Sequence, residues 1–194
     1  MAAGAERMTR AMQSLEAAFL RGVDGVTEIW LVRHADCYEG MSEGDDPPLS
    51  SLGRKQADLL AKRVHHVKPA AVYSSPYRRA LETARAISGD VRVDDRLVEM
   101  EMALGDDGEF EFKEVPESVI ERMGAAIGDI TQANSGQRVI VVAHGAAMIV
   151  FLTHVLRLEP GRLRFLPYFT SVNVIRVLGD RRMVSSLGDT AHLE

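Results

Sequence analysis

The stretch Val139-Ile140-Val141-Val142-Ala143, followed directly by His144-Gly145, decides the fold class of this chain. A short, continuous apolar run predicts a strand that is covered on both faces. Such strands belong to parallel sheets with helices packed on both sides. The run Ile29-Trp30-Leu31-Val32, followed by Arg33-His34, has the same form. The sequence therefore predicts two buried strands, each followed by a histidine.

From Glu28 onward, strand patterns alternate with helix patterns. Further strands are predicted at 71–73, 91–93, 172–178 and 183–187, the last two as a hairpin through Gly179-Asp180. Helices are predicted at about 53–64, 78–87, 118–134 and 146–156, and Ser118 with Glu121 forms a capping-box pattern at the start of the third. This order predicts an α/β fold, a three-layer α/β/α sandwich with a mostly parallel central sheet.

The first 26 residues differ from the rest of the chain. Met8, Met12, Leu15 and Phe19 recur at spacings that place them on one face of a helix. We expect residues 1–26 to form an N-terminal helical extension and residues 27–194 to form one domain. The apolar face leaves two roles open, which are packing on the body of the domain and forming a homodimer.

Composition narrows the class of protein. The chain has 194 residues, 46% of them hydrophobic and 26% charged, which is typical of a globular domain with a real core. Its net charge of −5 disfavours a nucleic-acid-binding face, because nucleic acid requires a cationic surface. Cys37 is the only cysteine, which excludes an intrachain disulfide. No apolar run is long enough to span a membrane, and charged residues near the start argue against a signal peptide. We therefore expect a cytoplasmic protein that binds neither nucleic acid nor a membrane.

Polar and basic residues follow three of the predicted strands. Arg33-His34 follows 29–32, Ser74-Ser75-Pro76 with Arg78-Arg79 follows 71–73, and His144-Gly145 follows 139–143. In an open parallel sheet, ligands bind beyond the carboxyl ends of the strands. Arginine offers a planar fork of donors that fits phosphate oxygens, and a helix N-terminus adds backbone N–H groups. The sequence therefore predicts that two histidines and at least two arginines form one phosphate site.

Several blocks of the sequence also resemble those of the histidine phosphatase superfamily, branch 1, whose members are phosphoglycerate mutase-like. In chain order they are Leu31-Val32-Arg33-His34-Ala35, the block 49–57, the block 74–84, Leu97-Val98-Glu99 and Val141-Val142-Ala143-His144-Gly145. The resemblance extends from about residue 28 to 178. It implies a phosphoglycerate mutase-like fold and a phosphatase or phosphotransferase activity.

The resemblance assigns roles to the site residues. It implies that His34 is the nucleophile, which forms a phosphohistidine, and we expect the pKa of His34 to lie near its ordinary value. Arg33, Arg79 and His144 are implied as phosphate-binding residues, with His144 as a cation. The implied mechanism needs no metal ion and no other cofactor.

Two of these assignments have a neighbouring competitor. Arg79 is preferred to Arg78 because the family's arginine directly precedes an alanine, here Ala80. Glu99 is implied as the acid that protonates the leaving alkoxide. Glu101 competes with it, since side chains two residues apart in an extended segment point to the same side.

The sequence departs from the mutase pattern in two places. Cys37 and Gly40 stand where mutases commonly carry polar residues, and Cys37 is expected to be a small buried filler rather than a redox-sensitive thiol. The segment between Glu99 and His144 has room for only one loop and one helix, which predicts a short cap and an open site. Water is the acceptor in a phosphatase, so an open site favours hydrolysis.

The leading hypothesis is therefore hydrolysis of a phosphomonoester on a small phosphorylated metabolite. Three alternatives stay open, which are a phosphoprotein (phosphohistidine) phosphatase, a phosphoglycerate mutase and a non-catalytic phosphate-binding protein. The loops at 39–46 and 103–116 are expected to determine which substrate is bound.

Overall fold

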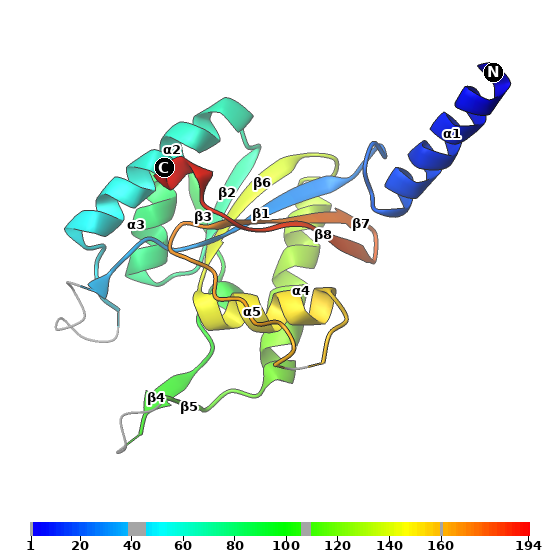
Figure 1. Ribbon diagram of the computed structural model, residues 1–194. Coiled ribbons are helices and arrows are strands. Elements are labelled where there is room, and N and C mark those ends of the chain that lie inside the picture. Colours follow the sequence, from blue (N-terminus) through cyan, green and yellow to red (C-terminus); the bar gives the residue numbers. More distant parts are fainter. Residues whose placement is uncertain (1, 39–45, 106–109, 160) are drawn as a thin grey trace.

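Figure 1 shows a computed structural model of the chain, which describes residues 2–38, 46–105, 110–159 and 161–194. Its centre is a six-stranded sheet with the strand order β3-β2-β6-β1-β7-β8. Strands β3, β2, β6 and β1 are parallel, whereas β7 and β8 are antiparallel. The strand bounds are β1 Thr27–Arg33, β2 Ala71–Ser74, β3 Val91–Val93, β6 Arg138–Ala143, β7 Val172–Leu178 and β8 Arg181–Asp189. The prediction of a mostly parallel sheet is confirmed.

Helices cover both faces of this sheet, as Figure 1 shows. Alternate residues of one strand point to opposite faces, so Trp30 and Val32 of β1 pack on the side of α2 and α3. Ile29 and Leu31 pack in the second core, on the side of α4 and α5. The bounds of these helices are α2 Ser51–Val67, α3 Arg78–Ile87, α4 Pro116–Ala133 and α5 Gly145–Val155. The three-layer sandwich is therefore confirmed.

The register of the central strands brings their carboxyl ends together. Arg33 at the end of β1 is opposite Ala143 of β6, and Ser74 at the end of β2 is opposite Val142 of β6. The residues that follow these three neighbouring strands therefore lie at the same edge of the sheet. This arrangement produces the convergence that the sequence predicts.

The start of α2 supports the loop that follows β1. The hydroxyl of Ser50 accepts a hydrogen bond from Gly53 N–H at 2.9 Å, which caps the helix. Gln56 Oε1 accepts one from Asp36 N–H at 2.9 Å. A Cβ on Gly53 would lie 1.9 Å from the backbone oxygen of Asp36, so only glycine allows this approach. The block 49–57 thus holds the loop next to His34.

Gly53→Ala should destabilise the protein by about 3 kcal/mol, because the new methyl group meets backbone rather than a side chain that can move. Gly128 in α4 is the matched control, since a Cβ there would have no heavy atom within 4 Å. Gly128→Ala should stabilise the protein by about 0.5–1 kcal/mol through helix propensity. Urea unfolding followed by the fluorescence of Trp30 measures both changes. Equal effects of the two substitutions would contradict the packing argument.

Two predicted details of the segment 99–134 are wrong. Ser118 does not cap α4, because Val115 is the N-cap, Pro116 occupies the first turn, and the Ser118 hydroxyl donates to Glu114 Oε1 at 2.8 Å. The predicted loop also contains two short strands, β4 (Met102–Leu104) and β5 (Phe110–Phe112), paired as an antiparallel ribbon. Residues 39–45 and 106–109 of the two loops expected to set specificity lie outside the described residues.

Helix α1 (Ala2–Ala18) extends away from the sheet and its covering helices (Figure 1). Its predicted apolar face is exposed, with Met8 at 66%, Met12 at 50%, Leu15 at 53% and Phe19 at 60%. Of the two roles left open by the sequence, packing of this face on the body of the domain therefore does not occur in the structure. The division of the chain at residue 26 stays a prediction. Among the described residues, no helix has the length and apolar character that a membrane crossing requires.

Candidate active site

His34 lies directly after β1 and is 4% exposed. Its Nδ1 is 2.8 Å from the backbone oxygen of Ala35. A carbonyl oxygen only accepts hydrogen bonds, so Nδ1 carries the proton and donates. This contact fixes the tautomer and leaves the lone pair on Nε2. Nε2 is therefore the ring nitrogen that could act as a nucleophile.

The surroundings of His34 lower its pKa from 6.5 to about 3. Burial is the largest cause, and the charges of Arg79 and Arg33 add to it, whereas the bond to Ala35 acts in the opposite direction. The expectation of an ordinary pKa is wrong, because a sequence does not show how far a ring is removed from water. His34 is thus neutral, and its lone pair is available, at neutral pH.

His144 follows β6, precedes α5 and is fully buried. Its ring centroid is 5.2 Å from that of His34, and its Nε2 is 2.8 Å from the Ser75 hydroxyl. That hydroxyl also accepts a hydrogen bond from Tyr77 N–H at 3.3 Å. His144 Nδ1 is buried and has no hydrogen-bond partner among the described residues. A buried polar atom without a partner is costly, so Nδ1 is available for a hydrogen bond to a bound group.

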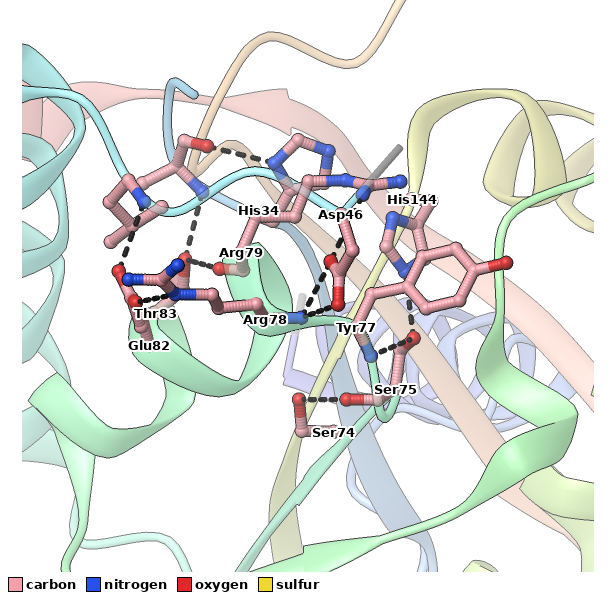
Figure 2. Close-up of polar contacts among 12 residues, drawn as sticks. His34, Asp46, Ser74, Ser75, Tyr77, Arg78, Arg79, Glu82, Thr83 and His144 are labelled. Atoms are coloured by element: carbon pink, nitrogen blue, oxygen red, sulfur yellow. Dashed lines mark hydrogen bonds and ion pairs between the residues drawn. The ribbon is translucent and has the colours of Figure 1, made fainter. Parts of the chain in front are cut away.

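The two predicted arginines lie beside these rings. Arg33 donates through Nη1 to the oxygen of Pro167 at 2.8 Å, and its guanidinium carbon lies 4.1 Å from the centroid of the Phe169 ring. Its Nε is buried and, like Nδ1 of His144, has no partner in the part of the chain that the structure describes. Arg79 has an 11% exposed side chain, which lies 3.4 Å from Asp46 Oδ1. Figure 2 shows the guanidinium of Arg79 near both imidazole rings.

Two side chains that support the site had no assigned role in the sequence. The Thr83 hydroxyl accepts from Ala35 N–H at 2.9 Å and donates to the oxygen of Arg79 at 2.7 Å, so it connects the nucleophile loop to α3. Ser75 orients His144 as described above. Both residues lie in the block 74–84, so the signal was present, but only the arginine of that block had a role.

Glu99 lies between a short 3-10 helix (Asp95–Leu97) and β4, beside the start of α5. Its Oε1 accepts hydrogen bonds from Met100 N–H at 2.9 Å and Ala147 N–H at 2.8 Å. Its Oε2 accepts one longer bond, from Ala146 N–H at 3.3 Å. The carboxylate is therefore anchored through Oε1, and Oε2 keeps more free capacity. Glu101 is exposed.

A cleft of about 1190 Å3 opens over these residues. Four of the five predicted site residues line it, namely Arg33, His34, Arg79 and Glu99. His144 lies beneath this surface, in contact with the His34 ring. Cys37 also lines the cleft, and burial raises the pKa of its thiol. Within the described residues, no three histidine, cysteine, aspartate or glutamate side chains form a metal-binding group.

The fold and the site define an α/β protein in which a neutral histidine and two arginines line a cleft at the carboxyl ends of the parallel strands. A family model for the histidine phosphatase superfamily (branch 1) matches residues 29–111 and 101–190. The chain belongs to this superfamily, and the resemblance noted in the sequence is confirmed.

Curated proteins similar to this chain include phosphatases and phosphoglycerate mutase-like proteins. A metal-independent phosphoserine phosphatase from Arabidopsis thaliana is 29% identical over 87% of this chain and 84% of its own length. Phosphoglycerate mutase-like protein 4 from the same plant is 29% identical over 86% and 87%. The crystal structure of a phosphoserine phosphatase mutant from Entamoeba histolytica with phosphoserine has a TM-score of 0.74 at 20% identity, over 87% of this chain and all of that one. The last likeness concerns the fold alone.

Binding of a dianion should bring a proton to His144. Burial is the largest cause that holds the pKa of His144 well below 6.5, and the positive charges of Arg79 and Arg33 add to it, so the free site holds His144 neutral. A bound dianion favours the charged ring and raises this pKa. Proton uptake makes binding weaker as pH rises, by up to about tenfold per pH unit. Calorimetric titration with tungstate, whose charge is constant near neutral pH, measures this slope. The slope should vanish in His144→Gln, and a pH-independent wild type would contradict the prediction.

Proposed function

We propose that this histidine phosphatase hydrolyses phosphomonoesters of small metabolites without a metal ion, through a phosphohistidine on His34. The observation that carries the proposal is the state of His34. Its ring is neutral, its Nδ1–H is fixed on Ala35, and the residue lines a cleft together with Arg33 and Arg79. A nucleophile of this kind needs no activating metal.

In the first step, Nε2 of His34 attacks phosphorus and the bond to the leaving oxygen breaks. Arg33, Arg79 and His144 donate to the phosphoryl oxygens, where negative charge develops. The unpartnered Nε of Arg33 and Nδ1 of His144 supply two of these donors. The guanidinium of Arg79 supplies the third contact.

Glu99 is the proton donor in this proposal. A proton on Oε2, the oxygen with more free capacity, passes to the leaving oxygen as the P–O bond breaks. In the second step, water attacks the phosphohistidine, Glu99 accepts the proton of the water, and His34 regains its lone pair. Inorganic phosphate and the alcohol are the products.

The test is hydrolysis of p-nitrophenyl phosphate in excess chelator, combined with trapping of labelled enzyme. We expect turnover that the chelator does not reduce, and a protein-bound phosphate that is stable in alkali and labile in acid. Loss of turnover in chelator, or an acid-stable label, would contradict the proposal. Absence of turnover with every ester would favour a non-catalytic phosphate-binding protein.

The names of the relatives support a small phosphorylated acid such as phosphoserine as substrate. The missing polar side chain at Cys37 favours hydrolysis over a mutase reaction. Rates with phosphoserine, with 3-phosphoglycerate and with a protein that carries phosphohistidine separate the three activities. If the protein that carries phosphohistidine reacts faster than the small esters, the proposed substrate is a phosphoprotein and not a metabolite.

We also propose that two copies associate through helix α1, in the cytoplasm. The exposed Met8, Met12 and Leu15 of α1, with Phe19 just after its end, support the dimer, since large side chains on one face gain free energy when covered. Sedimentation analysis should give a dimer for the wild type and a monomer for Leu15→Asp. A monomeric wild type would contradict the dimer.

A further inference from the structure

Arg122 of α4 lines the catalytic cleft, with a side chain that is 16% exposed. Its Nε and Nη2 donate to the two oxygens of Glu114 at 2.8 and 2.9 Å. Its Nη1 donates to the backbone oxygens of Arg96 and Val98, both at 2.8 Å. Its Nη2 also donates to the backbone oxygen of Glu99 at 3.3 Å.

These contacts use every donor of the side chain. A guanidinium has five N–H groups, and Arg122 makes five hydrogen bonds inside the protein. Arg122 therefore has no donor left for a phosphate or for another part of the substrate. Its position in the cleft wall needs a different explanation from that of Arg33 and Arg79.

The acceptors show what Arg122 holds. Three of them are backbone oxygens of the segment 96–99, which ends at Glu99. The fourth group is Glu114, whose Oε2 also accepts from Glu101 N–H at 3.3 Å. Arg122 and Glu114 thus fix the backbone on both sides of Glu99. Since the side chain of Glu99 reaches the start of α5 from this backbone, its place in the cleft depends on them.

We propose that Arg122, paired with Glu114, is a positioning residue for the proton donor Glu99. This inference rests on the proposed function, because it assigns a structural cause to one step of that reaction. Arg122 acts on the leaving group through Glu99 and takes no part in binding the phosphoryl group. Loss of Arg122 therefore weakens protonation of the leaving oxygen and leaves attack by His34 intact.

The dependence of rate on the leaving group tests this. p-Nitrophenolate leaves without protonation, whereas an alkoxide needs the proton. Arg122→Lys should lower kcat/KM for an alkyl phosphate such as glycerol 3-phosphate by about 30-fold, and for p-nitrophenyl phosphate by less than about threefold. Glu99→Gln should show the same pattern with a loss of about 100-fold or more for the alkyl ester.

Arg96→Lys is the matched control. The side chain of Arg96 forms ion pairs with the neighbouring Asp94 and with Asp129 of α4, and it does not line the cleft, so both rates should stay unchanged. If Arg122→Lys does not fold, Glu114→Gln is the second variant. It replaces one of the two oxygens that Arg122 binds by an NH2 group, and it should reproduce the selective loss. Equal losses with both esters, or no loss with either, would overturn the proposal. A wild type that hydrolyses neither ester would instead refute the proposed function.

Discussion

Replacing His34 by asparagine should lower hydrolysis of p-nitrophenyl phosphate by about 10⁴-fold or more, because the variant lacks Nε2, the nucleophile that we propose. The amide nitrogen of asparagine lies close to the place of Nδ1 in histidine. It can donate to the oxygen of Ala35, as Nδ1 does at 2.8 Å. The substitution thus removes Nε2 and keeps the contact that orders the loop.

Binding experiments separate lost chemistry from a lost site. The His34→Asn protein should still bind tungstate, since Arg33, Arg79 and His144 are unchanged. It should also carry no acid-labile phosphate after exposure to labelled substrate. His65→Asn is the surface control, because His65 is exposed on α2, and its activity should equal that of the wild type. Turnover in His34→Asn near the wild-type rate would refute the assignment of the nucleophile.

The prediction of the fold from the sequence succeeded where local pattern and tertiary packing favour the same structure. The strand β6 is a continuous apolar run, and its burial on both faces in the structure gives that run its physical cause. The helix predicted at 78–87 has these bounds in the structure. The ribbon β4–β5 was missed because the acidic run with two glycines at 104–109, which joins its strands, favours a loop in the sequence. Shortness alone does not explain the miss, since β3 also has three residues and was predicted.

For the candidate site, the sequence likewise predicted some features and missed others. The positions of His34, Ser75 and His144 follow from parallel topology, because strands β1, β2 and β6 are neighbours with aligned ends. The properties of these residues do not follow from it. The low pKa of His34 results from burial by residues distant in sequence, and the five contacts of Arg122 are to groups 8 to 26 residues away. No sequence motif near Arg122 predicts these five contacts.

The choice between Arg78 and Arg79 gives the second large expected effect. Arg79→Ala should lower kcat/KM for p-nitrophenyl phosphate by about 10³-fold, because its guanidinium lies by the rings of His34 and His144 and meets the developing charge. Arg78 has a 53% exposed side chain that pairs with Glu82 at 2.8 Å, one turn along the helix. An exposed pair of this kind contributes little, so Arg78→Ala should change the rate by less than about twofold.

The two substitutions are a matched pair, since the two arginines are neighbours on one helix and each substitution removes one positive charge. A general electrostatic effect on the anionic substrate would therefore appear in both variants, and more strongly at low salt. A loss confined to Arg79→Ala, together with weaker binding of tungstate, would instead show a direct contact with the phosphoryl group. Equal losses in the two variants would remove Arg79 from the site and leave Arg33 and His144 as the phosphate-binding residues.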